Sequence, residues 1–291
     1  MRENTLVQTM KQMEGEGEKQ PPVVIEPLKS WLSFDVRELW EYRELLYFFI
    51  WRDIKVRYKQ TILGGVWVIL QPLMPMIVFS VFFGLLVKVP SDNIPYPIFT
   101  YTALLPWHLF AYVFYTSSES LVANQGLITK VYFPRLFVPL SVLLSGLIDF
   151  LIPLPLLVGM MYYFGIELTW TALCVPLFLL LTLLTALGVG LWSSALNVQY
   201  RDVHYIINFS IQFLMFATPI FYPASIVPDR WRLLYGLNPM VGVVEGFRWA
   251  LLGEGQPFHP SIFLSVPIVV LLLISGLLYF NRVEKTFADY L

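Results

Sequence analysis

The chain has 291 residues, of which 57% are hydrophobic and only 13% are charged, and its mean hydropathy is +0.66. This composition excludes an ordinary soluble domain and predicts an all-α protein embedded in a membrane. The 19 Lys and Arg residues nearly balance the 20 Asp and Glu residues. The chain therefore has no general basic field for binding nucleic acid. Its single cysteine, Cys174, excludes an internal disulfide and cysteine-based metal sites.

Apolar segments long enough to cross about 30 Å of hydrocarbon occur six times along the chain. We predict transmembrane helices at residues 64–87, 97–123, 136–163, 171–196, 205–222 and 261–280. The fifth is short and contains Asn208, Gln212 and Pro219. Residues 231–252 are apolar enough to suggest a seventh span, but their Arg and Glu side chains would be costly in hydrocarbon. We therefore predict that residues 223–260 form short helices or a re-entrant turn that does not cross.

The positions of Lys and Arg predict the orientation, because cytoplasmic loops are enriched in these residues near the ends of spans. With six spans both termini lie on one side, and that side carries fifteen Lys and Arg residues against four on the other. Arg52, Lys55, Arg57 and Lys59 directly precede the first span. The sequence thus predicts a multi-pass protein of the cytoplasmic (inner) membrane with both termini in the cytoplasm and residues 223–260 outside.

Two regions precede the first span. Residues 1–34 are polar and include alternating Glu and Gly residues followed by Pro21-Pro22, which predicts a mobile tail. Residues 35–63 begin with Asp35 and Glu38 as a possible cap. They place apolar side chains near one helical face, namely Val36, Leu39, Trp40, Tyr47, Ile50, Trp51 and Ile54. We expect an amphipathic helix in contact with lipid at the cytoplasmic surface; a helix packed on a partner protein is the alternative.

The sequence does not predict an enzyme. His108, His204 and His259 lie in separate segments without metal-ligand spacing, and no Gly-Lys dipeptide is present for a Walker A phosphate loop. Asp149 within the third span and Glu119 near the end of the second are candidates for function, because charges inside a membrane are costly. For both we favour an acid that is protonated or hydrogen-bonded to a neighbouring helix over a proton relay. We expect no catalytic residue, metal site or cofactor in this chain.

Aromatic residues make up 16% of the chain, and two spans carry them at helical spacing. Phe209, Phe213 and Phe216 share a face of the fifth span, and Phe79, Phe82 and Phe83 cluster similarly in the first. Such rings can stack on the apolar C–H faces of sugars and form a weakly binding channel wall. Contact with lipid or packing in the core is the alternative for each residue.

Several motifs near the ends of the spans resemble those of one known family. They are Arg-Tyr-Lys-Gln-Thr-Ile-Leu-Gly-Gly-Val-Trp at 57–67, Gln-Pro-Leu at 71–73, Asn-Gln-Gly-Leu-Ile-Thr-Lys-Val-Tyr-Phe-Pro-Arg at 124–135, Asn-Val-Gln-Tyr-Arg-Asp at 197–202, Thr-Pro-Ile-Phe-Tyr at 218–222, Leu-Asn-Pro-Met at 237–240 and Glu-Gly-Phe-Arg at 245–248. Over residues 35–291 the chain resembles the permease subunit of polysaccharide-exporting ABC transporters of the second exporter type. Members of that family move O-antigen, teichoic acid or capsule chains.

The resemblance implies the partners of the chain. Two copies of the permease would pair in contact with membrane lipids, two copies of an ATPase subunit would bind beneath them, and a lipid-linked glycan would pass between the permeases. ATP and Mg would bind the partner subunit and not this chain. The first cytoplasmic loop would act as the coupling helix in a groove of the ATPase, with contacts from Asn124, Gly126, Leu127, Lys130, Phe133 and Arg135.

The resemblance also places two further sets of residues. The first and fifth spans would surround the glycan path, and the residues that we expect to line it are Trp67, Phe79, Phe83, Phe209, Phe213 and Phe216. The external re-entrant helices would carry Asn238, Pro239, Glu245 and Arg248. An exporter of lipids or drugs with the same fold is the nearest alternative. A membrane-embedded lipid-sugar transferase is less favoured. Such an enzyme needs paired acids for metal and diphosphate, and the predicted cytoplasmic loops of this chain lack them.

Overall fold

The computed structural model describes residues 40–59, 64–200, 202–253, 260–284 and 287, and the regular elements within these residues are helices. The chain separates into two compact units, Met1–Phe34 and Asp35–Leu291, and the described residues belong to the second. The tail predicted at residues 1–34 and the cap predicted at Asp35 and Glu38 lie outside the described residues.

Within the described residues, four helical segments are long and apolar enough to cross a membrane, judged by length and composition. They are Val66–Leu86, Phe137–Phe164, Trp170–Gln199 and Phe263–Glu284. These segments correspond to the first, third, fourth and sixth predicted spans. The chain is therefore an all-α membrane protein with several spans, as predicted.

The other two predicted spans are helices of a different kind. Helix α5 (Tyr96–Ala123) has 28 residues, enough for about 42 Å, but it includes many Tyr, Ser and Thr side chains. Helix α10 (Val203–Ala217) is apolar but has only 15 residues. It ends before the predicted boundary at Tyr222, because Pro219 disfavours helical backbone at Thr218, which is extended. The total of six spans stays a prediction.

The first span changes its helical type along its length. Helix α4 (Val66–Phe79) contains Pro72 and Pro75 and continues into a π-helix, η1 (Ser80–Leu86). The amide of Val87 bonds to the carbonyl oxygen of Phe82, five residues earlier, at 2.9 Å. Helices of this type are rare and are frequently found at functional sites. Within the chain the span is loosely held, since only 11% of its most apolar 18-residue stretch is buried.

The third predicted span is interrupted. Helix α7 (Phe137–Leu151) and helix α8 (Leu154–Phe164) are separated by Ile152 and Pro153. Pro153 has no amide hydrogen to give to the carbonyl of Asp149, so the helical hydrogen bonding stops there. The short 3-10 helix η2 (Trp170–Cys174) then leads into α9 (Val175–Gln199), the fourth span.

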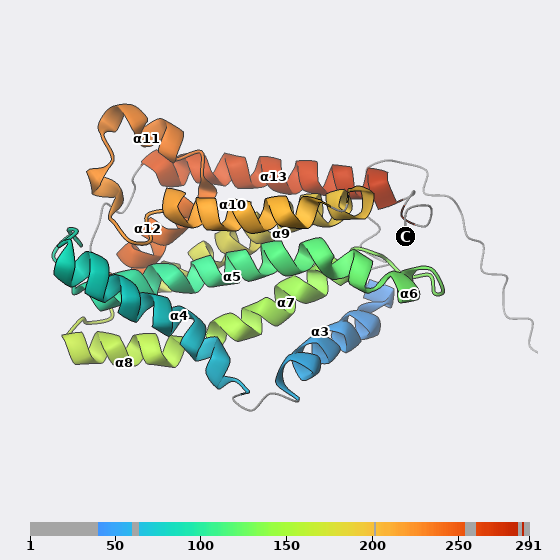
Figure 1. Cartoon of the computed structure of the whole chain (residues 1–291), viewed down its shortest axis with the longest axis horizontal. Coiled ribbons are helices and arrows are strands. Elements are labelled where there is room, and N and C mark those ends of the chain that lie inside the picture. Colours follow the sequence, from blue (N-terminus) through green and yellow to red (C-terminus); the bar gives the residue numbers. More distant parts are fainter. Residues whose placement is uncertain (1–39, 60–63, 201, 254–259, 285–286, 288–291) are drawn as a thin grey trace, which may run out of the picture. The chain divides into compact units, whose positions relative to one another are not determined.

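Helix α5 is the centre of the bundle. It packs against α4, α7, α9, α10 and α12, and the first four of these run beside it in Figure 1. Tyr101, Phe99 and Trp107 of α5 are among the largest fully buried side chains. The mixed composition of α5 therefore reflects its position, because it is surrounded by protein on several sides.

Helix α9 packs closely against α13 (Pro260–Glu284). A Cβ atom added to Gly276 would lie 2.6 Å from the carbonyl oxygen of Gly188, and one added to Gly188 would lie 3.0 Å from the backbone of Leu272. Small residues thus let the two backbones touch, which is the usual way in which membrane helices pack tightly.

The helix predicted at the cytoplasmic surface is α3 (Arg43–Tyr58), which packs on α7. On the predicted apolar face the aromatic residues Trp40, Tyr47 and Trp51 are 70%, 69% and 47% exposed, whereas Ile50 and Ile54 are half-buried. The opposite face carries Phe49, which is 1% exposed, and several charged residues that point into the bundle. The predicted residues Val36 and Leu39 lie outside the described residues.

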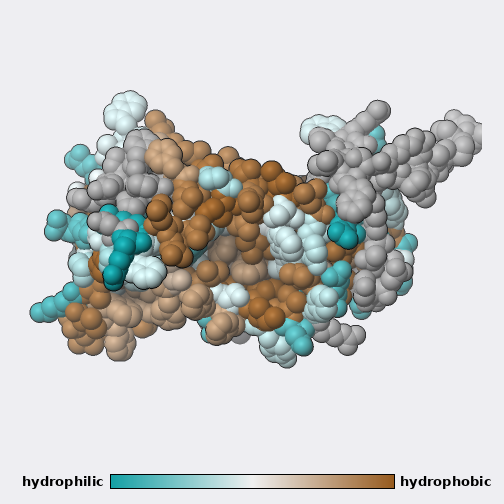
Figure 2. Space-filling model, turned by 90° about the horizontal axis from the view of Figure 1, so that it is seen from above, coloured by the Kyte–Doolittle hydropathy of each residue, from teal (hydrophilic) through white to brown (hydrophobic). Residues whose placement is uncertain are grey.

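The region predicted to be external forms the 3-10 helix η3 (Ala224–Ile226) and the helices α11 (Asp229–Tyr235) and α12 (Pro239–Leu252). Helix α12 is not superficial, because it packs against α5, α9 and α13 and buries most of its residues. Figure 2 shows one face of the molecule, which is apolar over most of its middle and carries its polar residues mainly toward the two ends. An apolar band of this kind suits a protein surrounded by lipid.

Candidate functional site

The aromatic stripe predicted in the fifth span lies on the outside of the chain. Phe209, Phe213 and Phe216 of α10 are 69%, 62% and 61% exposed, and the rings of Phe209 and Phe213 stack with centroids 6.4 Å apart. Packing within the core of the same chain is therefore excluded as their role. The three rings are available to lipid, to a second copy of the chain or to a passing glycan.

One end of this stripe meets the aromatic residues of the first span at Phe221. The Phe221 ring is 4.0 Å from that of Phe79, 5.9 Å from that of Phe83 and 5.8 Å from that of Phe216, measured between centroids. Phe221 itself is 3% exposed. The structure thus joins Phe79, Phe83 and Phe216 into one aromatic cluster through a residue that sequence reasoning missed. Phe221 lies in a segment without helical periodicity, so no stripe pointed to it.

Trp67 does not belong to this cluster. It lies near the beginning of α4, about 18 Å along the helix axis from Phe79, and is 53% exposed. The six predicted path residues therefore divide into the α10 stripe, the Phe221 cluster and a separate ring close to the predicted cytoplasmic end of the first span.

A cavity between α4, α5 and α7 contrasts with this exposed surface. It has a volume of about 50 Å³ and is lined by residues that include Gln71, His108, Tyr112 and Asp149. A volume of this size holds one or a few water molecules but no sugar ring. This cavity is therefore not a glycan path, and a path that uses the aromatic residues must run along the outer surface of the chain.

The coupling segment, residues 124–135, contains the short helix α6 (Gln125–Ile128). Its apolar residues do not share one environment. Phe133 is 3% exposed and packs on Phe49 of α3, with centroids 5.5 Å apart, whereas Val131 and Tyr132 are 52% and 63% exposed. Phe133 therefore anchors the segment to its own chain and does not present its ring to an ATPase groove.

The remaining predicted coupling residues are placed in two ways. Gly126 and Lys130 are exposed and Leu127 is half-buried. Asn124 accepts a hydrogen bond from Arg52 of α3 at 2.8 Å, and Arg135 donates to the backbone carbonyl of Glu284 near the end of α13. The two ends of the segment are thus tied to the bundle, while its middle is open to a partner.

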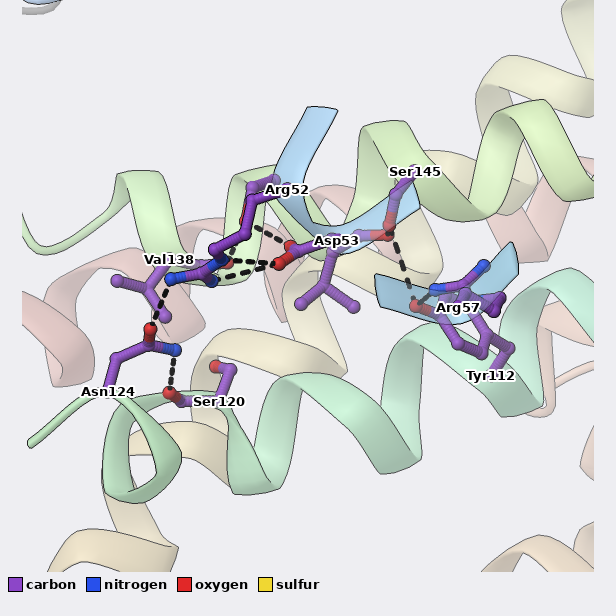
Figure 3. A network of polar contacts seen from close by, with 10 residues as sticks. Arg52, Asp53, Arg57, Tyr112, Ser120, Asn124, Val138 and Ser145 are labelled. Atoms are coloured by element: carbon purple, nitrogen blue, oxygen red, sulfur yellow. Dashed lines mark hydrogen bonds and ion pairs between the residues drawn. The ribbon is translucent and has the colours of Figure 1, made fainter. Parts of the chain in front are cut away.

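Charged residues of α3 connect this segment to the spans (Figure 3). Arg52 pairs with Asp53 at 2.8 Å, and the Ser141 hydroxyl of α7 donates to Asp53 at 3.1 Å. One turn further along, Arg57 pairs with Asp149 of α7 and donates to the hydroxyl of Tyr112 of α5. A chain of polar contacts therefore leads from the coupling segment along α3 into the bundle.

Asp149 is hydrogen-bonded to a neighbouring helix, as the sequence analysis favoured, and it is also ion-paired. Besides its pair with Arg57, it accepts a hydrogen bond from the hydroxyl of Tyr58. Burial lowers the pKa of the Arg57 guanidinium, and the nearby Tyr58 and Asp53 oppose this shift. Sequence reasoning missed the pair, because Arg57 was assigned to the membrane surface. Glu119, the other candidate, accepts a hydrogen bond from Tyr115 at 3.1 Å, a residue of the same helix and not of a neighbouring one.

The residues predicted in the external region hold α12 in place. Asn238 caps α12 by accepting from the amide of Met240 at 3.1 Å, and Pro239 occupies the first helical position, where its missing amide hydrogen costs nothing. Arg248 is 2% exposed, pairs with Glu245 at 3.0 Å and lies 3.5 Å above the ring of Phe99. The charge that argued against burial of this region is therefore compensated inside the protein.

Comparison with known proteins agrees with this architecture. Residues 44–252 match the model of the ABC-2 type transporter family. The O-antigen export system permease protein RfbA of Myxococcus xanthus is 32% identical over 254 residues, covering 86% of this chain and 96% of that protein. The protein of the same name from Klebsiella pneumoniae is 30% identical over 82% of this chain and 92% of its own length.

A more distant relative is the polysialic acid transport protein KpsM of Escherichia coli, 25% identical over 80% of this chain and 91% of that protein. The chain belongs to the ABC-2 type transporter family. It is a multi-pass membrane transporter subunit, and the family resemblance described from its motifs is confirmed.

Proposed function

We propose that this chain is the permease subunit of an ABC transporter that exports a lipid-linked polysaccharide of the O-antigen kind across the cytoplasmic membrane. The relatives named for O-antigen export match it over nearly their whole length. The observation that carries the proposal is the exposed stripe of Phe209, Phe213 and Phe216, which is continued by the Phe221 cluster.

An exposed stripe becomes a path only when a second surface faces it. Two copies of the chain that meet across α4 and α10 would enclose the stripes of both. Each ring offers an apolar face to the C–H face of a sugar, with a gain of about 0.5 to 1.5 kcal/mol if pairs of aromatic rings are a fair guide. Contacts this weak permit a chain to slide while the sum of several keeps it in the path.

The energy would come from a separate ATPase subunit present in two copies, which binds ATP and Mg. It would receive the exposed middle of the coupling segment, namely Gly126, Lys130, Val131 and Tyr132. This arrangement needs the coupling segment and both termini in the cytoplasm, in agreement with the excess of Lys and Arg on that side. The permease itself would then carry no catalytic residue.

The proposal is tested by reconstituting the chain with its ATPase subunit in liposomes. Export of a lipid-linked glycan should require ATP, and the glycan should stimulate ATP hydrolysis. The lipid carrier without sugars should neither be exported nor stimulate hydrolysis. A test variant carries Ala at Phe209 and Phe213. It should assemble normally but export less glycan than the wild type. Equal transport of the sugar-free lipid would instead support the alternative of a lipid exporter.

A further inference from the structure

The segment from Thr218 to Tyr222 follows α10 and is not helical, yet its backbone is held from several sides. The Tyr96 hydroxyl of α5 donates to the carbonyl oxygen of Phe221 at 2.6 Å. Arg248 of α12 donates to the carbonyl oxygen of Ile220 at 2.9 Å, and the Asn238 amide contacts the segment through the Thr218 side chain, whose hydroxyl accepts at 2.9 Å. Long side chains thus replace the hydrogen bonds that a helix would have supplied.

Tyr96 also contacts the first span. A Cβ atom added to Gly84 of η1 would lie 2.9 Å from the Tyr96 ring, so the absence of a side chain at Gly84 lets the π-helix rest on this ring. Tyr96 is 8% exposed and therefore fixed between η1 on one side and Phe221 on the other. One residue of α5 therefore contacts both the π-helix, which carries Phe83, and the segment that carries Phe221.

We infer that Tyr96 and Phe221 are positioning residues for glycan export, and that they set the separation between the η1 and α10 walls at the predicted outer end of the path. Phe221 fills the space between Phe79 and Phe83 of the first span and Phe216 of α10. Because Phe221 is buried, it acts through these neighbours and does not touch the glycan. Without the Tyr96 hydroxyl, the carbonyl of Phe221 loses a buried partner and the ring loses its fixed place.

This inference rests on the proposed function, and its test keeps the two apart. In the reconstituted transporter, Tyr96→Phe removes one hydroxyl and preserves the ring that rests on Gly84. Glycan export should fall about fivefold, the factor that corresponds to one hydrogen bond of average strength. Tyr101→Phe is the matched control, because Tyr101 belongs to the same helix, is buried and donates to a carbonyl oxygen, that of Pro153 at 3.4 Å, away from Phe221.

Phe221→Leu should lower export by a similar factor, since Leu keeps the apolar contact but lacks the ring. The double variant Tyr96→Phe/Phe221→Leu should export as much as either single variant, because residues that act as one unit are not additive. A purely structural role would instead give losses that follow the amount of folded protein.

A second measurement reports the wall directly. In a Cys174→Ala background, Phe83→Cys and Phe216→Cys should be joined by a short thiol cross-linker at one well-defined rate. Adding Tyr96→Phe should change that rate, whereas adding Tyr101→Phe should not. If the wild type exports glycan and the Tyr96→Phe variant exports and cross-links equally well, the inference is wrong. If the wild type itself exports no glycan, the proposed function is wrong.

Discussion

The rings of Phe49 in α3 and Phe133 in the coupling segment lie 5.5 Å apart, and both are almost completely buried. The surface helix is therefore packed directly on the segment that we expect to contact the ATPase. The Phe133 end of the coupling segment cannot move without displacing α3, and Arg57 of α3 is paired with Asp149 of α7. Displacement of the coupling segment would therefore be transmitted to the spans through α3. This relationship changes which residues should be tested for coupling.

We predict that the exposed residues of the segment make the ATPase contact. Val131→Asp together with Tyr132→Ala should abolish glycan-stimulated ATP hydrolysis and lower export at least tenfold, while the permease stays folded because neither side chain is buried. Co-purification with the ATPase subunit and thermal unfolding of the permease measure the two effects. By contrast, Phe133→Ala should cost about 3 to 5 kcal/mol of stability, because it empties a buried site. Normal coupling in the Val131/Tyr132 variant would place the ATPase contact elsewhere.

The pair formed by Arg57 and Asp149 should stabilise the attachment of α3. Asp149→Leu leaves the partly buried Arg57 without its acidic partner and should cost about 2 kcal/mol, less than for a fully buried pair because both side chains retain some exposure. The double variant Arg57→Met/Asp149→Leu should recover most of this loss, since no unpaired charge remains. Unfolding of the detergent-purified protein provides the measurement, and a double variant as unstable as the single one would show that the pair is not the cause.

The six-span topology can be tested at three exposed Lys and Arg positions. In a Cys174→Ala background, Lys88→Cys and Arg230→Cys should react with an impermeant thiol reagent added outside intact cells, and Lys130→Cys should react only after the membrane is opened. If α5 does not cross the membrane, Lys88→Cys and Lys130→Cys will react from the same side. This experiment addresses α5 directly, which is less apolar than the four clearest spans.

Replacement of the exposed stripe should separate ring stacking from simple apolarity. Phe209, Phe213 and Phe216 changed to Leu should leave insertion and dimer assembly intact, because Leu keeps an apolar surface. Glycan export should nevertheless fall about tenfold, as three weak stacking contacts are removed. Export assayed in liposomes is compared with that of a control with Leu at Tyr162 and Tyr163, which are also exposed aromatic residues, 90% and 81%, but lie at the end of α8. Equal export by both variants would assign the stripe to contact with lipid.

Apolar length located most helices from the sequence, and local chemistry explains where it did not. The prediction of 97–123 for the second span is close to α5 at Tyr96–Ala123. The third and fifth spans differ because Pro153 and Pro219 interrupt helices inside apolar runs, a signal that hydropathy averages away. The surface helix was predicted, but the burial of its charged face was not, since its partners lie on α5 and α7.

The candidate site was less accessible to prediction, because it depends on contacts between distant segments. The stripe on α10 follows from helical spacing. Phe221 was missed although its motif, residues 218–222, had been noted, since an irregular segment has no periodicity that assigns sides to its residues. For the same reason nothing in residues 124–135 distinguished the buried Phe133 from the exposed Tyr132.

The backbone contact between Gly188 of α9 and Gly276 of α13 determines which parts of the subunit can move separately. With no layer of side chains between them, these two helices cannot slide or rotate past each other without collision of main-chain atoms. The first span, which begins with α4, is held less firmly, because only 11% of its most apolar 18-residue stretch is buried. Movement transmitted from the ATPase would therefore displace α9 and α13 together as one rigid unit. Helix α4 would be the part of the subunit that can move relative to them.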